Sequence, residues 1–356
     1  MRVLYDYQAF LQRQGGVPRY FAELIDALKK IGDFEASIPR LFSDNEYLEN
    51  TRIFLTRRHF KGKERIMDLA NRPRARRALG GPFDLFHPTY YKTYFLGKLD
   101  RPFVITVHDM VHEIFDSTRI RDDGTARNKR ILCQHASRII AVSNNTKNDL
   151  CRLLGVPAEK IAVIHHGTNL RYRGEPRLHT APYILYVGAR GGYKNFGTFL
   201  SAAASLARRH GVDILCAGGG QLTAFEKRSI DSLGLAGRMR HVPAGSSGEL
   251  SSLYHFASVF CYPSLYEGFG LPLLEAFACG CPVAASATSS IPEVAGNAAE
   301  YFDPNSPDAI ADRIERILLD PDRSAQLVSA GADRLRAFSW EKSARQTYAV
   351  YREALN

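Results

Sequence analysis

The sequence has no apolar run long enough to cross a membrane. Its 356 residues are 45% hydrophobic and 24% charged, and the longest largely apolar stretch, residues 271–285, carries Glu275 in its middle. A transmembrane helix needs about 20 consecutive apolar residues. The N-terminus reads Met-Arg-Val-Leu-Tyr-Asp-Tyr, in which charged residues interrupt any signal-peptide core. We therefore expect a cytoplasmic protein without a targeting segment.

Cysteine is also scarce. The chain has six cysteines, and no two of them have the C-x-x-C spacing. Six in a chain of this length are too few for a disulfide framework, which a reducing compartment would not maintain. Cys279 and Cys281 flank one glycine in an apolar stretch that offers no further metal ligands. We expect buried thiols and no metal site.

Acidic residues are fewer than basic residues only in the first half of the chain. The net charge is +10; residues 1–175 hold 30 Lys and Arg against 20 Asp and Glu, whereas residues 176–356 hold 17 of each. Residues 52–77 carry ten basic groups against Glu64 and Asp68, with apolar residues interleaved. A basic amphipathic segment favours an anionic surface.

Three interpretations of segment 52–77 stay open. A charge run is usually a solvated helix face. The segment could instead lie on an anionic membrane or contact an anionic acceptor, since each Lys or Arg near an acidic leaflet contributes on the order of 1 kcal/mol. Nucleic acid is the third candidate. No nucleic-acid-binding motif accompanies the segment, so we do not expect nucleic acid as a partner.

Short β-rich segments alternate with segments of helical length and period throughout the chain. Several of them are continuously apolar, which is typical of parallel strands buried on both faces. The predicted strands are residues 3–7, 83–87, 103–107, 139–143, 161–165, 183–187, 213–217, 239–242, 259–262, 282–285 and 299–302. The pattern predicts an α/β protein with two doubly wound, Rossmann-like domains.

A polar segment with Gly174 and Pro176 separates the two sets of strands and has no periodicity. We predict an N-terminal domain over residues 1–170, a linker over 171–181, a second domain over 182–338 and a final helix over 339–356. Two such domains would face each other across a cleft at the carboxyl ends of their strands, where open α/β sheets bind ligands.

The most informative motif is Glu-Gly-Phe-Gly-Leu-Pro-Leu-Leu-Glu, which runs from Glu267 to Glu275. A predicted strand precedes it, and a helix should begin at Pro272, since proline suits the first helical position. The glycine loop therefore lies at a helix N-terminus, where free N–H groups and the helix dipole favour phosphate. Carboxylates accept hydrogen bonds from sugar hydroxyls. The pattern indicates a ligand with phosphates and hydroxyls; a tight turn with a capping Glu is the plainer alternative.

This motif resembles the E-x7-E signature of retaining glycosyltransferases, in particular glycosyltransferase family 4, which has the GT-B fold. The resemblance extends over nearly the whole chain. It includes a glycine loop at residues 14–20, a strand end that carries His108, a Val-Ser strand end at 142–143, the loop 187–195, and Phe338-Ser339-Trp340 before the last helix, which in the family crosses back to the first domain.

The resemblance implies a role for each candidate residue. Arg190 and Lys194 would neutralise the diphosphate of a nucleotide sugar, together with the N–H groups of Phe269, Gly270 and Leu271. Glu275 would hold the ribose, Glu267 the donor sugar, and His108 would lie near the reacting bond. Gly16, next to Gly15, would pack against the donor. The backbone contacts that select the base stay open, with the neighbourhood of Val242 as one candidate. Because fixed cations and amides serve the phosphates, the resemblance implies no metal and no cofactor. In many members the arginine directly follows the glycine, whereas here Ala189 intervenes.

The expected function is transfer of a hexose, with retention of configuration, to a glycan or lipid-linked acceptor in bacterial surface polysaccharide assembly, such as lipopolysaccharide. The donor stays open between GDP-mannose and a UDP-hexose; residues 193–196 are similar to bacterial mannosyltransferases. Two alternatives remain. The first is another enzyme on this scaffold, such as a nucleotide-sugar epimerase or a phosphorylase. The second is a non-catalytic nucleotide-sugar-binding protein.

Overall fold

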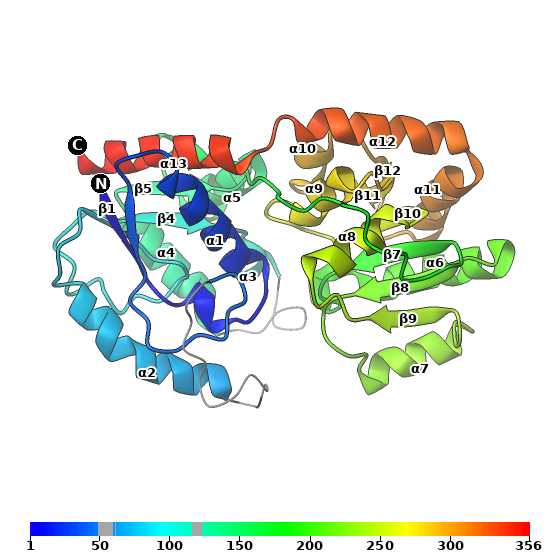
Figure 1. Ribbon diagram of the computed structural model, residues 1–356, viewed down its shortest axis with the longest axis horizontal. Helices are drawn as coiled ribbons and strands as arrows, with labels where there is room; N and C mark the ends of the chain where they lie inside the picture. Colours follow the sequence, from blue (N-terminus) through cyan, green and yellow to red (C-terminus); the bar gives the residue numbers. More distant parts are fainter. Residues whose placement is uncertain (49–59, 61, 116–122) are drawn as a thin grey trace. The chain divides into compact units, whose positions relative to one another are not determined.

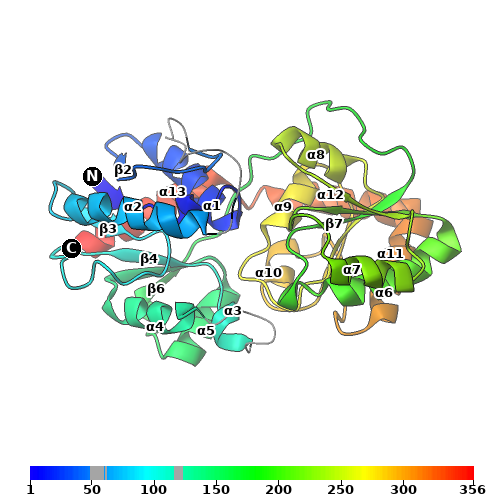
Figure 2. The same cartoon turned by 90° about the horizontal axis from the view of Figure 1, so that it is seen from below.

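The computed structural model describes residues 1–48, 60, 62–115 and 123–356, and these residues form two compact units. Unit 1 comprises residues 1–113, 122–166 and 340–356, and unit 2 comprises residues 114–121 and 167–339. Figures 1 and 2 show that helices cover the strands of each unit on both faces. The final helix thus belongs to unit 1, and the segment predicted as a linker belongs to unit 2.

Unit 1 contains only parallel strand pairs among its described residues. Two three-stranded sheets, in the orders β2-β1-β3 and β4-β5-β6, meet where Phe86 pairs with Phe103. The strands are β1 (Arg2–Tyr5), β2 (Glu35–Ser37), β3 (Leu85–His87), β4 (Val104–Val107), β5 (Arg138–Ala141) and β6 (Ile161–Val163). The helices are η1 (Ala9–Leu11), α1 (Gly16–Lys29), α2 (Lys63–Ala78), α3 (Val111–Ile114), α4 (Thr125–His135), α5 (Asn144–Leu154), η2 (Ala158–Lys160) and α13 (Trp340–Leu355).

Unit 2 is built on one six-stranded parallel sheet in the order β12-β11-β10-β7-β8-β9. Its strands are β7 (Tyr183–Val187), β8 (Asp213–Ala217), β9 (Met239–Val242), β10 (Val259–Tyr262), β11 (Val283–Ser286) and β12 (Glu300–Phe302). Its helices are η3 (Gly192–Lys194), α6 (Phe196–His210), α7 (Ala224–Ser232), α8 (Ser247–His255), α9 (Leu271–Ala278), α10 (Ile291–Ala295), α11 (Pro307–Leu319) and α12 (Pro321–Leu335).

The predicted α/β class and every predicted strand are confirmed, with ends that shift by at most two residues. The sequence analysis missed β2, which has three residues and no apolar run. Five of the six cysteines are buried, as expected, and Cys151 is partly exposed. Over the described residues, no helix combines the length and the apolar character that a membrane span requires.

The final helix, α13, is a structural part of unit 1 and packs against α1. Its Tyr351 is fully buried, and the hydroxyl lies 2.7 Å from the Tyr5 hydroxyl and 2.7 Å from Nδ1 of His87. Trp340, at the start of the helix, stacks on His166 with ring centroids 5.8 Å apart. Residues from both ends of the sequence therefore share one core.

We predict that Tyr351→Phe destabilises unit 1 by about 1–3 kcal/mol, because it leaves two buried polar groups without a partner. Urea unfolding monitored by circular dichroism measures the change. The matched control is Tyr348→Phe on the same helix, whose side chain is partly buried against the same core. The control should change the free energy of unfolding by less than about 0.5 kcal/mol. Equal losses in the two variants would contradict the prediction.

Candidate functional site

The site in unit 2 forms where two loops leave the sheet at the same edge. Strands β7 and β10 are parallel neighbours, and the chain continues from β7 to β8 on one side and from β10 to β11 on the other. The carboxyl ends of β7 and β10 thus flank the point at which the strand order reverses, where open α/β sheets bind ligands. The loops after these strands span residues 188–195 and 263–270.

Lys194 and Glu267, one from each loop, form an ion pair in which Nζ lies 2.7 Å from Oε1. The two loops are also joined through the backbone, because Leu265 N donates to Tyr193 O at 2.8 Å. Asn195, at φ +59°, donates from Nδ2 to Pro263 O. The structure therefore brings together the two residues that were predicted to bind phosphate and sugar. Their side chains remain 20% and 11% exposed, so a ligand can reach them.

The glycine loop of unit 2 is held by two serines that precede α10. Ser289 Oγ accepts from Glu267 N, and Ser290 Oγ donates to the carbonyl oxygens of Glu267 and Phe269. Gly270 has φ +111°, and a Cβ there would lie 3.0 Å from a Leu273 methyl carbon, so this position requires glycine.

Helix α9 begins at Leu271, one residue before the predicted start, and Leu273 N donates to Gly270 O at 3.0 Å. Glu275 follows the first turn of this helix. It is only 4% exposed, and Oε2 accepts from the Tyr254 hydroxyl at 3.1 Å. Burial, reinforced by this carboxylate, raises the pKa of Tyr254 well above its usual value. Burial and the hydrogen bond from Tyr254 together hold the side chain of Glu275 in one position.

Arg190 does not lie with Lys194 and Glu267. Its side chain is only 3% exposed, and Nε lies 2.7 Å from Oε1 of Glu226. Its terminal nitrogens donate to the carbonyl oxygens of Gly218, Gly219, Gly220 and Gln221. In this conformation the guanidinium holds the loop after β8, and its predicted contact with phosphate stays a prediction.

The site residues of unit 1 lie at the ends of β1 and β4. Gly15 caps α1 and Gly16 begins it, and a Cβ at Gly16 would meet no described atom within 4 Å. His108 follows β4, and its ring packs against Tyr20 of α1, with centroids 4.9 Å apart. The buried Nε2 of His108 has no hydrogen-bond partner among the described residues. Burial lowers the pKa of His108 to about 4, so the ring is neutral at pH 7.

Sequence reasoning missed the groups that support His108. His87 Nε2 lies 3.0 Å from the Thr106 hydroxyl, which lies 3.2 Å from the Tyr20 hydroxyl. His166 lies in the core of unit 1 and packs against Tyr20 and Trp340. Of the hydrogen-bonded groups, only His87 ends a predicted strand, so there was little signal for them in the sequence.

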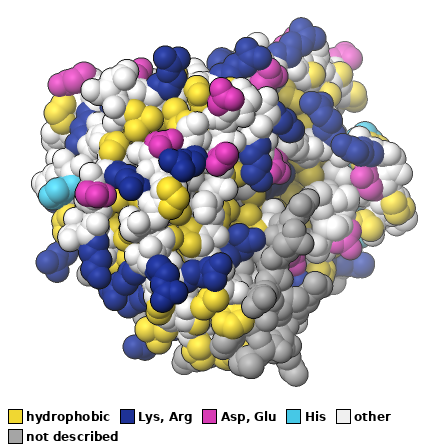
Figure 3. All heavy atoms as spheres, turned by 60° about the vertical axis from the view of Figure 1, so that its left-hand side comes forward, with side chains coloured by type: hydrophobic (Ala, Val, Ile, Leu, Met, Phe, Trp, Pro, Cys, Tyr) yellow, Lys and Arg dark blue, Asp and Glu magenta, His cyan; other side chains and the backbone are white. Residues whose placement is uncertain are grey.

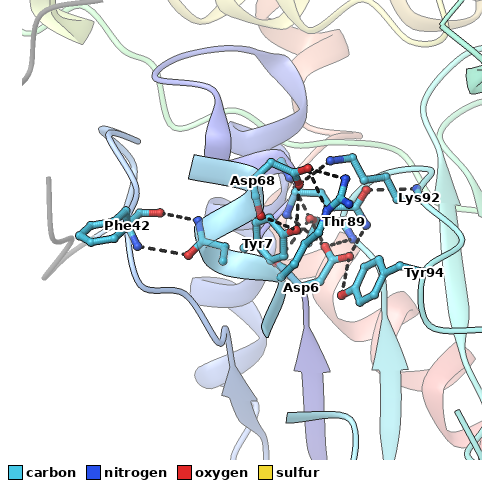
Figure 4. Close-up of polar contacts among 11 residues, drawn as sticks. Asp6, Tyr7, Phe42, Asp68, Thr89, Lys92 and Tyr94 are labelled. Atoms are coloured by element: carbon cyan, nitrogen blue, oxygen red, sulfur yellow. Dashed lines mark hydrogen bonds and ion pairs between the residues drawn. The ribbon is translucent and has the colours of Figure 1, made fainter. Parts of the chain in front are cut away.

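A second polar network joins the carboxyl ends of β1 and β3 (Figure 4). The buried Asp6 accepts from the hydroxyl and the N–H of Thr89, and burial raises its pKa. Asp68 of α2 accepts from the Tyr7 hydroxyl and pairs with Lys92 and Arg72. The network fixes α2 to the sheet.

No group of three or more His, Cys, Asp or Glu side chains in the described part of the chain could hold a metal ion. Unit 2 thus offers one lysine, two carboxylates and a helix N-terminus. Unit 1, taken by itself, offers the buried ring of His108, which packs against the helix that Gly16 begins. Such groups suit an anionic, hydroxyl-rich ligand.

Two such parallel α/β units define the GT-B fold. Solved structures share the fold: sucrose-phosphate synthase from Thermosynechococcus elongatus aligns with a TM-score of 0.77 at 22% identity, over 99% of this chain and 98% of that one. HepE from Anabaena, in complex with UDP-glucose, aligns with a TM-score of 0.76 at 19% identity, over 98% and 99%.

Family models assign both halves of the chain. Residues 14–172 match the model "Glycosyltransferase Family 4", and residues 171–334 match "Glycosyl transferases group 1". The chain therefore belongs to the glycosyltransferases that combine these two domains, and the predicted family is confirmed.

Curated relatives are similar to parts of the chain. O-antigen chain mannosyltransferase B from Escherichia coli is 31% identical over 61% of this chain and 61% of its own length, which is less than two thirds. D-inositol 3-phosphate glycosyltransferase from Thermobispora bispora is 29% identical over 77% of this chain and 72% of its own length.

We predict that acidification destabilises unit 1. Burial lowers the pKa of His87 to about 3, that of His108 to about 4, and that of His166 well below its usual value of 6.5. Below about pH 6.5 the unfolded chain binds protons that the folded chain excludes, so stability is present above this pH and lost as the pH falls. The loss should be on the order of 1 kcal/mol per histidine and pH unit. Asp6, whose pKa is raised, opposes this trend.

Urea unfolding at pH 7.5, 6.5 and 5.5 measures this dependence. The variant His166→Phe preserves an aromatic ring between Tyr20 and Trp340 and should flatten the pH dependence. A free energy of unfolding that does not change between pH 7.5 and 5.5 would contradict the prediction.

Proposed function

We propose that this protein is a retaining, metal-independent hexosyltransferase. It transfers a hexose from a nucleotide-diphosphate sugar to a glycan or lipid-linked acceptor in bacterial surface polysaccharide assembly. The observation that carries the proposal is the Lys194–Glu267 pair at the reversal of the strand order, beside the N-terminus of α9. The proposed location is cytoplasmic, at the inner face of the cytoplasmic membrane.

The proposed reaction uses groups that are present in each unit. The bond between the anomeric carbon and the β-phosphate oxygen breaks, and an acceptor oxygen bonds to the same face of the sugar. The acceptor proton moves to the departing phosphate, so no protein base is required. Negative charge develops on that phosphate, and a fixed cation stabilises it more in the transition state than in the ground state. Lys194 supplies this charge, and the first N–H groups of α9 add to it.

The carboxylates and the histidine orient the sugar and the nucleoside. Glu267 binds donor-sugar hydroxyls once the diphosphate draws Lys194 away, and Glu275 binds the ribose. His108 is neutral, so its ring can hydrogen bond to the donor sugar without bringing a second positive charge. Gly15 and Gly16 let the backbone of unit 1 approach the donor.

The proposed donor is GDP-mannose, and a UDP-hexose is the second candidate. The similarity to O-antigen chain mannosyltransferase B supports the first, and the fold shared with HepE, whose structure contains UDP-glucose, favours the second. The family assignment makes a glycosyltransferase more plausible than an epimerase or a binding protein.

Helix α2 supports a peripheral contact of unit 1 with an anionic membrane. It exposes the apolar residues Ile66 and Leu69, spaced three apart on one face, and four arginines, Arg65, Arg74, Arg76 and Arg77. Figure 3 shows basic and hydrophobic side chains close together on the lower part of the face that it presents. Such a surface binds acidic headgroups.

Not every basic residue of segment 52–77 contributes to this surface. Lys63 was counted among its cations, but it is 2% exposed and pairs with Asp44, so it stabilises the fold instead. Arg52, Arg57, Arg58 and Lys61 lie outside the described residues.

We predict that one nucleotide-sugar set raises the melting temperature of the wild-type protein in a thermal-shift panel of GDP, UDP and ADP with their common sugars, without added metal.

We also predict that Lys194→Ala lowers kcat by about 100-fold or more, because it removes the cation that faces the leaving phosphate. The control Lys227→Ala removes an exposed lysine of α7 and should leave kcat unchanged. The absence of any shift, or a Lys194→Ala rate close to wild type, would argue against the proposal.

We predict that the double charge reversal Arg74→Glu with Arg77→Glu lowers binding to vesicles of phosphatidylglycerol and phosphatidylcholine by about tenfold or more. Both side chains are exposed on α2. The control reverses two exposed charges of α7, Lys227→Glu with Arg228→Glu, and should leave binding unchanged. Sedimentation measures vesicle binding. Equal effects of the two pairs of substitutions would indicate that the exposed face of α2 is an ordinary solvated helix face.

A further inference from the structure

The loop after β8 has a backbone that other residues must hold in place. Gly218, Gly219 and Gly220 follow the strand in succession, at φ +81°, +66° and +71°. Three consecutive residues in this region are accessible to glycine at little steric cost, but glycine also has the most conformational freedom to lose. Their carbonyl oxygens do not pair within a helix or strand, so they need partners elsewhere.

Arg190 supplies most of these partners, and Nε2 of His241 also lies 3.1 Å from Gly218 O. The Arg190 guanidinium donates to Gly218 O at 2.7 Å, Gly220 O at 2.9 Å and Gln221 O at 2.9 Å, with a longer contact of 3.3 Å to Gly219 O. The planar guanidinium presents five N–H donors on three nitrogens in a fixed fork, whereas the ammonium of a lysine has three donors on one nitrogen and cannot span these separate acceptors in the same way. The backbones also pack closely: a Cβ at Gly219 would lie 2.8 Å from Gly188 O. These contacts bind the loop after β7 tightly to the loop after β8.

Glu226 completes this arrangement from α7. Its Oε1 accepts from Arg190 Nε, and its Oε2 accepts from the N–H of Thr223 at 2.7 Å, which closes a capping box. One carboxylate thus fixes both the arginine and the start of the helix that follows the glycine loop. An arginine that turned toward a ligand would leave Glu226 and four carbonyl oxygens without this donor.

The 218–221 loop, which Arg190 and Glu226 hold, lies at the edge of the sheet where the donor is proposed to bind. Strand β8 lies between β7 and β9. On the proposed function, the diphosphate lies at the loops after β7 and β10, and the candidate location for the base is near Val242, where β9 ends. A donor that spans these points must cross the end of β8, where residues 218–221 turn.

We propose that Arg190 and Glu226 are positioning residues that hold the 218–221 loop as a preformed wall for the nucleoside part of the donor. They set donor affinity, and the charge of the leaving phosphate is met by Lys194. This inference rests on the proposed function. It departs from the role that the family resemblance implies for the arginine, and it assigns a role to Glu226 that the sequence motifs did not indicate.

The test is a set of four variants: Arg190→Ala, Arg190→Lys, Glu226→Ala and the double variant Arg190→Ala with Glu226→Ala. Calorimetry measures the Kd for GDP and UDP, steady-state kinetics with GDP-mannose and UDP-glucose measure kcat and KM, and hydrogen exchange reports on residues 218–221. We expect each single alanine variant to raise the nucleotide Kd and the donor KM by about tenfold, with kcat within about threefold of wild type. The double variant should be no worse than the weaker-binding single variant, because both substitutions release the same loop.

Arg190→Lys separates positioning from catalysis. If Arg190 acted through its charge on the phosphate, lysine would restore most of the rate. If it acts through its several hydrogen bonds, lysine should not restore affinity, and amide exchange at 218–221 should be faster in all four variants. Arg238→Ala is the matched control, since Arg238 also binds a glycine carbonyl and pairs with a carboxylate, at the amino end of β8. It should leave the Kd unchanged.

Three results would overturn the inference. They are a loss of kcat of about 100-fold in Arg190→Ala with an unchanged Kd, effects of Arg190 and Glu226 that multiply, or wild-type Kd and exchange in all variants. Each of these leaves the proposed function intact, provided that the wild-type protein binds a nucleotide. A wild-type protein that binds neither GDP nor UDP would instead refute the proposed function and this inference together.

Discussion

The candidate site of unit 2 depends on the parallel pairing of β7 with β10. This pairing places the ends of two strands, 70 or more residues apart in sequence, at the same edge of the sheet. The loops that follow are then joined by one backbone hydrogen bond, by the Asn195 side chain and by the Lys194–Glu267 ion pair. On the proposed function, the phosphates of the donor would replace Glu267 as the partner of Lys194, and the released carboxylate would bind the sugar hydroxyls.

In unit 1, burial favours the neutral form of the His108 ring. His108 lies against Tyr20 and Phe21, and the buried rings of His87 and His166 belong to the same aromatic group. Desolvation disfavours the charged form of all three rings. The final helix contributes Tyr351 and Trp340 to this group, so a segment more than 200 residues away from β4 helps to set the protonation of the candidate site.

The sequence predicted the class of the fold, all but one of its strands, and the family. These features depend on local composition: apolar runs predict buried parallel strands, and a glycine loop before proline predicts a helix start. The pairing of Lys194 with Glu267 and the partners of Arg190 could not be predicted in this way. They depend on which strands are neighbours and on where long side chains turn after a loop, and neither is encoded in residue type or spacing. The burial of Lys63 was missed for the same reason, since its partner Asp44 lies outside the helix.

The arginine of the loop after β7 lies one position later than the family resemblance implies, with Ala189 directly after Gly188. Its side chain reaches the loop after β8 and pairs with Glu226, whereas Lys194 pairs with Glu267. A guanidinium bound to a carboxylate and four carbonyl oxygens has exchanged its hydration for fixed partners, and a phosphate would have to displace them all. The lysine, by contrast, has one carboxylate partner and remains partly exposed. On the proposed function, Lys194 thus responds to the ligand and Arg190 holds the shape of the loop beside it, a division of roles that the sequence motif alone does not name.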